Sequence, residues 1–374
     1  MKKFLALVAL PMAILTGVAP VHAASVITLT EPAHRLMDGT FLDDGLAAEL
    51  APSGKLGALI FPPTYSYASG RTWYIDPALI GEVQAMTVPY KLLDGTPGTG
   101  QDVALAWLSR LHGDLVGATV MPVVDGNPSE YWVKRFIPHD RNYLLQNAQL
   151  TLSNELGQNV STISQYLSTR YFLLTKGEIE AIAQTTVALQ KYGMYMSPDE
   201  TALFRTSLQK IMNPDLSVNS RSFLARDLAT HTTALQNTIH LVAGKFTITS
   251  SQQNLPVTIV NGFDKAAKVN LLIGSTNQRI LASDQKNIEV GAKSKVQVMV
   301  PVRVVASGST GLDIRLITSS GVQLQPDLIY PVSVTVISPI ATWITTGAAL
   351  VLFFAALTRS FKRLRRKNFH GEPS

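Results

Sequence analysis

The sequence predicts an α/β plus helical ectodomain, then an immunoglobulin-like β-sandwich, and finally one C-terminal transmembrane helix. Three observations lead to this prediction. Strand-like runs alternate with helical patterns in the first third of the chain, apolar and polar residues alternate after residue 238, and a late stretch has no charge. The expected segments are a signal peptide (1–23), an α/β region (24–125), a mostly helical region continuous with it (126–238), the sandwich (239–336), the transmembrane helix (339–358) and a basic cytoplasmic tail (359–374).

The N-terminus has the three parts of a secretory signal. Lys2 and Lys3 form a basic start, an apolar run extends over Phe4–Val18, and small residues precede Ala23. This pattern predicts cleavage after Ala23. The alternative is an uncleaved anchor, which Pro11 and the shortness of the apolar run disfavour.

The α/β region begins with a short apolar run, Leu56–Phe61, which we interpret as a buried strand. A second strand is expected at Thr72–Ile75, followed by a helix that Asp76 caps and Pro77 starts. A third strand is expected within Val116–Val124. Alternation of strands and helices predicts a parallel or mixed sheet.

Four helices are expected in the region 126–238. The clearest start is at Thr175, because Glu178 lies three residues later and completes a capping box. The expected helices are Arg141–Leu156, Lys176–Lys191, one from Pro198 to about Met212, and Ser222–Thr238.

The region 239–336 has about seven short segments of alternating polarity separated by Gly, Asn, Asp and Ser. That density of strands is typical of an immunoglobulin-like sandwich, although the cysteines of antibody domains are absent. Its last strand reaches almost to Pro339, so we expect the sandwich to lie against the membrane surface.

The stretch 339–358 is 20 residues long and uncharged, enough to span about 30 Å as a helix. A basic cluster follows it directly, which is typical of a cytoplasmic edge. The residues expected to anchor the chain in the membrane are Trp343, Arg359, Lys362, Arg363, Arg365, Arg366 and Lys367. Membrane lipids are therefore the first expected partner.

Composition excludes several classes of function. The chain has no cysteine, so it has neither disulfides nor cysteine-based catalytic or metal sites. Two of the 32 basic residues lie in the signal and six in the tail, so residues 24–358 keep 24 against 25 acidic residues. Such a balanced surface does not predict a nucleic-acid partner.

Two acidic residues follow predicted strands of the α/β region, which is where ligands gather in such sheets. Asp76 and Asp125, with Trp73 beside them, are therefore the candidate ligand-binding residues. The alternative is structural: Asp76 caps a helix, Asp125 serves a turn, and Trp73 packs in the core. No catalytic residue, metal ligand or cofactor site is predicted, and Gly95–Gly100 lacks the Lys-Ser/Thr of a phosphate loop.

Several stretches together resemble an actinobacterial family of single-pass envelope proteins, the domain-of-unknown-function family numbered 6049. They are Arg35–Gly57, Thr72–Met86, Gly95–Leu111, Phe246–Ser275 and the span with its basic tail. The resemblance implies a shortened member, and the family's L-P-Y-x-D-P-D stretch corresponds here to Met121–Asp125 without the Tyr. Such proteins are often encoded near the lipid II flippase, which implies work on the cell wall.

The sequence therefore favours a non-enzymatic, membrane-anchored extracytoplasmic protein that acts as an interaction or scaffold component of cell-wall assembly. The lipid II flippase and other membrane proteins of wall assembly are its expected partners. The alternative is a carbohydrate-active enzyme, deacetylase-like or glycosidase-like, that acts on wall glycan. An enzyme would need clustered carboxylates with perturbed pKa values in a pocket.

Overall fold

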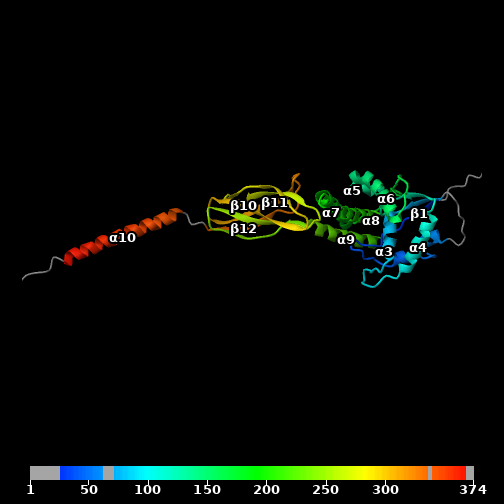
Figure 1. Cartoon of the computed structure of the whole chain (residues 1–374), viewed down its shortest axis with the longest axis horizontal. Coiled ribbons are helices and arrows are strands. Elements are labelled where there is room, and N and C mark those ends of the chain that lie inside the picture. The colour runs from blue at the N-terminus through cyan, green and yellow to red at the C-terminus, as the bar shows by residue number, and fades with distance from the viewer. Residues whose placement is uncertain (1–25, 62–70, 336–338, 368–374) are drawn as a thin grey trace, which may run out of the picture. The chain divides into compact units, whose positions relative to one another are not determined.

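We describe the protein from a computed structural model, which covers residues 26–61, 71–335 and 339–367 (Figure 1). The contacts between these residues form two compact units. One lies within Met1–Phe172 and Met212–Ser217, and the other within Leu173–Ile211 and Val218–Ser374. The predicted signal peptide and the end of the predicted tail lie outside the described residues.

The first unit is built on a three-stranded parallel sheet in the order β1–β2–β3. The strands are β1 (Val26–Leu29), β2 (Thr72–Ile75) and β3 (Thr119–Pro122), so the strands expected at 72–75 and within 116–124 are confirmed. The helices are α1 (Gly45–Leu50), α2 (Lys55–Ile60), α3 (Pro77–Met86), α4 (Gln101–Asp114), α5 (Glu130–Phe136), the 3-10 helix η1 (Pro138–Asp140) and α6 (Arg141–Leu156).

The strand expected at Leu56–Phe61 is wrong, because this segment forms helix α2. Leu56 and Ile60 lie one helical turn apart and are both buried, whereas Ala58 between them is exposed. Gly57 lies so close to the preceding helix that an added Cβ would be 1.7 Å from the carbonyl oxygen of Ala51. A six-residue apolar run has no periodicity that distinguishes a short helix from a strand.

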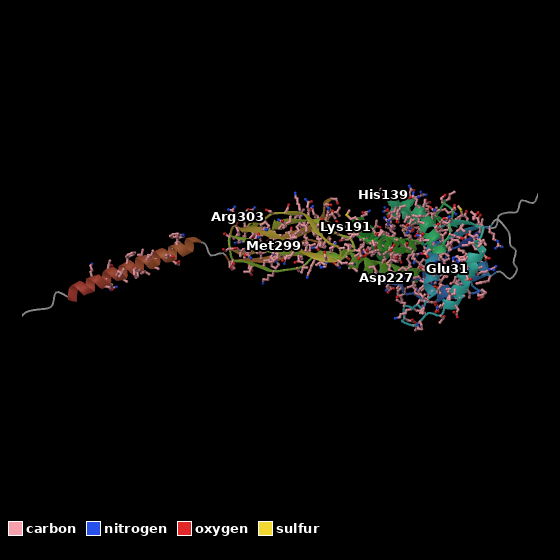
Figure 2. The ribbon with its side chains drawn as sticks, viewed as in Figure 1. Glu31, His139, Lys191, Asp227, Met299 and Arg303 are labelled. Atoms are coloured by element: carbon pink, nitrogen blue, oxygen red, sulfur yellow. The ribbon has the colours of Figure 1, made fainter. Side chains whose placement is uncertain are left out.

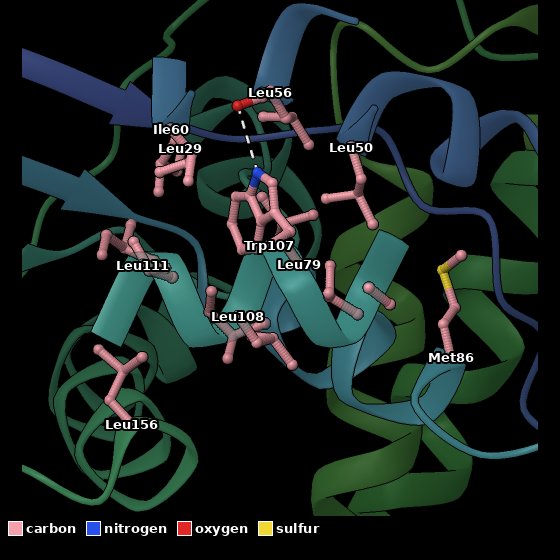
Figure 3. Close-up of a cluster of buried hydrophobic side chains, with 14 of the residues drawn as sticks. Leu29, Leu50, Leu56, Ile60, Leu79, Met86, Trp107, Leu108, Leu111 and Leu156 are labelled. Carbon is pink, nitrogen blue, oxygen red and sulfur yellow. Dashed lines mark hydrogen bonds between the residues drawn. The ribbon is translucent and has the colours of Figure 1, made fainter. Parts of the chain in front are cut away.

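The core of the first unit lies where α2 and α4 cover the sheet (Figure 3). Trp107 of α4 is fully buried, and its Nε1 donates a hydrogen bond to the carbonyl oxygen of Leu56 at 3.2 Å. Leu29 of β1 and Ile60 of α2 pack in the same cluster. A buried indole needs such an acceptor, so this bond fixes the register of α4 against α2.

The glycine-rich segment Gly95–Gly100 closes on a buried tyrosine. The hydroxyl of Tyr90 donates to Asp44 and accepts from Gly100 N at 2.8 Å. Thr99 donates to the other oxygen of Asp44 from both its backbone N and its Oγ1, at 2.8 and 2.6 Å. Burial raises the pKa of the Asp44 carboxyl, but hydrogen bonds from Thr99 and Tyr90 outweigh it and hold that pKa below its usual range. The segment is therefore a structural turn into α4.

The second unit contains three long helices: α7 (Lys176–Tyr192), α8 (Pro198–Ile211) and α9 (Val218–Gln236). The capping box predicted at the start of α7 is confirmed, since Thr175 and Glu178 each bond the other's backbone N. Inside the pair formed by α7 and α9, the hydroxyls of Thr185 and Thr232 bond each other at 2.7 Å. The region 126–238 was expected to be continuous with the α/β region, but it is divided between the two units. Helices α5 and α6 belong to the first unit and α7–α9 to the second.

The strands of the second unit form two sheets in a sandwich-like pair, ordered β4–β6–β10–β8 and β5–β12–β11–β7–β9. The strands are β4 (Ile239–Leu241), β5 (Phe246–Ile248), β6 (Gln252–Asn261), β7 (Ala267–Ser275), β8 (Ile280–Ala282), β9 (Gln285–Val290), β10 (Ser294–Val304), β11 (Gly308–Thr318) and β12 (Leu328–Val334). The hydroxyl of Tyr192 in α7 donates to the carbonyl of Leu324, which links the helices to the strands. The Tyr192 ring also stacks on the buried Phe263.

The last described element is α10 (Pro339–Lys367). Its window Trp343–Ser360 is long and apolar enough to cross a membrane, and it is not buried inside the protein. The helix continues through Arg359 and Lys362, so the basic residues after the apolar stretch extend the same helix.

The close approach of the glycine-rich turn to Tyr90 predicts a position-specific effect of one methyl group. A Cβ added at Gly98 would lie 1.9 Å from the Tyr90 ring, so Gly98→Ala should lower the free energy of unfolding by about 1–3 kcal/mol. Gly113→Ala is the matched control, because no atom lies within 4 Å of its added Cβ in α4. The control should be neutral or slightly stabilising. Urea unfolding followed by tryptophan fluorescence measures both, and equal effects would contradict this packing.

Candidate functional site

The carboxyl edge of the parallel sheet brings the two predicted acids to neighbouring positions. Asp76 follows β2, and Asp125 follows β3, which pairs with β2 in parallel register. One oxygen of Asp76, Oδ1, accepts from Ala78 N at 2.9 Å and from Gly126 N at 2.8 Å. Asp76 therefore caps α3, as the sequence predicted, and also holds the turn that follows β3.

The turn after β3 depends on left-handed backbone conformations. Gly126 has a φ of 72° and Asn127 a φ of 46°. The backbone N–H of Gly126 donates to Asp76, and the carbonyl oxygen of Gly126 accepts from Asn213 Nδ2 at 2.9 Å. Glycine and asparagine tolerate this region of backbone space, which explains the sequence Asp-Gly-Asn at this place.

Two further segments of the first unit cover this turn. Ser129 N donates to the carbonyl of Met212 at 2.8 Å, and Ser129 Oγ donates to the carbonyl of Arg170 at 2.6 Å. Arg170 in turn forms an ion pair with Asp215 at 2.9 Å. The segments around residues 168–170 and 212–215 therefore lie over the edge where an α/β enzyme would have an open cleft.

Burial decides what the three predicted ligand-binding residues can do. Asp76 is 0% exposed and Asp125 is 3% exposed, and Asp125 Oδ2 accepts from Asn147 Nδ2 of α6 at 3.4 Å. Trp73, on the central strand, is also completely buried. A glycosidase needs two carboxyls that reach the sugar, and an aromatic platform needs an open ring face. In this arrangement the three side chains support the fold.

Glu155 on α6 is a carboxyl that the sequence reasoning missed. It is half-buried, and burial raises the pKa of Glu155 above its usual range. A raised pKa is a property of general acids, but a general acid must also lie within hydrogen-bond reach of the reacting group of a bound substrate. Among the described residues, no group of three or more His, Cys, Asp or Glu side chains is arranged to hold a metal ion.

An aromatic cluster on α5 is the second feature that the sequence reasoning missed. Its members are Tyr131, Trp132, Phe136, Tyr171 and Phe172. The rings of Tyr131 and Tyr171 meet edge to face with centroids 5.2 Å apart, and both also contact Trp132. Tyr131 is 45% and Tyr171 55% exposed, so the cluster reaches the surface. The cluster forms only because two segments about forty residues apart in the sequence pack together.

A partly exposed ion pair joins the helix that carries Tyr131 and Trp132 to α6. Glu130, at the start of α5, accepts from Arg141 Nη2 at 2.6 Å and from Arg141 Nε at 2.8 Å. The hydrogen bond from Arg141 is the main cause that holds the pKa of Glu130 below its usual range. Arg141 also lies over the ring of Tyr166, 5.6 Å from its centroid. Because these groups pair with one another, α5 is held firmly against α6.

Comparison with known proteins identifies the family. A model described as a family of unknown function, DUF6049, matches residues 141–374, more than half of the chain. The chain belongs to this family. The match begins at α6 and includes all of the second unit and α10. No curated protein matches the chain.

Three of the similar solved structures each match about a quarter of the chain. WR4, a C. elegans MSP family member, is 14% identical over 26% of this chain and 98% of its own, with a TM-score of 0.21. Alpha-2-macroglobulin from Escherichia coli, from domain MG7 to the C-terminus, is 16% identical over 26% of this chain and 16% of its own, with a TM-score of 0.22. The YadV chaperone is 10% identical over 27% and 53%, with a TM-score of 0.21. Similarities this low carry no functional argument.

The role of Asp76 predicts a loss of stability when its carboxylate is removed. Asp76→Ala leaves Ala78 N and Gly126 N without this acceptor, so the free energy of unfolding should fall by about 2–4 kcal/mol. Asp76→Asn keeps one acceptor oxygen and should lose less. The control Asp102→Ala, on the exposed first turn of α4, should cost less than about 1 kcal/mol. Urea unfolding would contradict this role if all three variants had the same stability.

Proposed function

We propose that this chain is a non-enzymatic, membrane-anchored protein of an actinobacterial envelope, which presents its first unit outside the cytoplasm to partners of cell-wall assembly. In this proposal α10 spans the membrane, a cleaved signal directs export, and the basic residues from Arg359 onward face the cytoplasm. The two sheets, antiparallel except for the pair β5 and β12, form an immunoglobulin-like sandwich that precedes α10 in the chain.

The observation that carries this proposal is the exposed aromatic cluster on α5. Tyrosine and tryptophan are the residues that most often dominate the binding energy of protein interfaces. Here two exposed tyrosines surround Trp132, which is buried but whose Nε1 donates to no described residue. Because Trp132 Nε1 is itself buried, the contact surface that a partner would meet is formed by Tyr131 and Tyr171.

The arrangement of the carboxylates supports a binding role over an enzymatic one. Asp76 is occupied by two backbone N–H groups, and Asp125 lies under α6. Substrate would have to displace the segments that cover them before either could act. Turnover of wall glycan by the purified protein, lost in Asp125→Asn with the fold intact, would overturn the non-enzymatic proposal.

Photo-crosslinking in living cells tests the binding role. A photoreactive phenylalanine in place of Tyr171 should crosslink to a membrane protein of wall assembly, with the lipid II flippase as the first candidate. The same group in place of Leu105, which is 48% exposed on α4, is the matched control and should give no such product. Tyr131→Ala should reduce the crosslink from Tyr171 several-fold, because the two rings are in contact. Identical products from both positions, or none from Tyr171, would contradict the proposal.

A further inference from the structure

One end of the sandwich is defined by three turns and the end of β12, and we call it the stem end. Thr335 N donates to Ile248 O at 2.8 Å, which places the end of β12 beside the turn between β5 and β6. Val304 N donates to Ser251 O at 2.9 Å, and Val305 N to Arg279 O at 2.7 Å. The turns at 249–251, 276–279 and 305–307 therefore gather where the chain leaves the sandwich.

The stem end is joined to α10 by a very short length of chain. The last described residue of the sandwich is Thr335, and α10 begins at Pro339. A chain of four residues reaches at most about 14 Å. The headgroup layer on each side of a bilayer is roughly 5–8 Å thick. If α10 spans the membrane, as proposed above, the stem end lies within reach of the lipid headgroups.

The charges of the sandwich are distributed unevenly between its two ends. The stem end carries Arg279 and Arg303, both exposed, and the stretches 246–254, 276–283, 301–310 and 332–335 contain no Asp or Glu. The opposite end carries acidic residues, and one of them, Asp264, pairs with Lys293 at 3.2 Å. Among the described residues, Arg303 has no ion-pair partner. The stem end is thus a positive surface, and Asp284, which directly follows the second of these stretches, accepts from Ile273 N at 2.8 Å.

A cavity of about 360 Å³ opens at the stem end. Arg303 forms part of its wall, and Figure 2 shows this residue and Met299 toward the same end of the sandwich. The remaining lining is mostly amide and small side chains: Gln252, Gln253, Asn254, Leu281, Ala282, Ser283, Pro301 and Val302. Such a lining offers one cation and several hydrogen-bond donors, which suits a phosphate group.

Two large apolar side chains flank these arginines. Leu281, in β8, is 53% exposed, and Val305, directly after β10, is 60% exposed. On a surface that faces water only, both would lose the benefit of apolar burial. Apolar side chains beside cations are typical of surfaces that rest in the headgroup layer of a membrane.

We propose that the stem end binds the phosphate groups of anionic phospholipids in the membrane that α10 enters. Arg279 and Arg303 contact the phosphates, the cavity beside Arg303 receives one headgroup, and Leu281 and Val305 enter the interface. This contact holds the stem end of the sandwich on the membrane surface. The inference rests on the proposed membrane anchoring and adds a second, lipid-specific contact to it.

The full-length chain in phospholipid vesicles tests this inference, and the absence of cysteine permits single labels. A fluorophore on Leu281→Cys should be quenched by headgroup nitroxides in vesicles that contain phosphatidylglycerol, and much less in phosphatidylcholine alone. A label on Val322→Cys, in the turn at the opposite end, is the positional control and should stay unquenched. Inorganic phosphate in solution should not replace the anionic lipid in this effect, and full quenching in phosphatidylcholine with added phosphate would contradict it.

Charge variants identify the residues responsible. Each arginine near an anionic membrane raises the ratio of lipid-bound to unbound stem ends by about fivefold. Arg303→Gln should therefore lower this ratio by about fivefold. The double variant that adds Arg279→Gln should lower the same ratio by about a further fivefold. The matched control is the double variant Lys268→Gln with Lys295→Gln. It removes two exposed cations from the end of β7 and β10 that lies away from the stem end, and it should leave quenching unchanged. Equal loss in both double variants would overturn the inference.

A third label separates failure of this inference from failure of the membrane anchoring. A fluorophore on Leu352→Cys, within α10, should be quenched by acyl-chain nitroxides in every lipid composition. If Leu352 is not quenched, the anchoring itself is wrong. If Leu352 is quenched while the label at residue 281 behaves like that at residue 322, α10 inserts but the stem end does not bind lipid.

Discussion

The structure depends first on the apolar surface of α10. The window Trp343–Ser360 packs against no other part of the described chain, so its side chains need an environment other than water. A continuous helix satisfies its own backbone hydrogen bonds, which is the condition for crossing a bilayer. The proposed membrane span would give these side chains an apolar environment. In the proposed topology, the short connection from Thr335 to α10 keeps the sandwich next to the membrane.

Within the first unit, a single carboxylate has the organising role. Asp76 lies where α/β enzymes place catalytic groups, yet it bonds the first turn of α3 and the turn after β3. The same chemical group can serve either purpose, and what distinguishes them is access. Because the edge is covered and Asp76 is fully buried, the partner surface that we propose for this unit lies elsewhere, at the exposed Tyr131 and Tyr171.

Local signals in the sequence were enough to predict most elements. The cap of α7 by Thr175, the start of α3 at Pro77 and the alternating strands of the sandwich each depend on neighbouring residues alone. Helix α2 was not predictable in this way, because its six residues are too few to show a period. The cover over Asp125 and the contact of Tyr131 with Tyr171 join distant segments, and no local pattern encodes such pairings.

The orientation of the chain across the membrane is the central claim, and cysteine accessibility in intact cells measures it directly. The chain has no cysteine of its own, so Ser275→Cys and Ser374→Cys each provide a single thiol. A membrane-impermeant maleimide should label Ser275→Cys in intact cells and Ser374→Cys only after the cells are permeabilised. Labelling of Ser374→Cys but not of Ser275→Cys in intact cells would contradict the account.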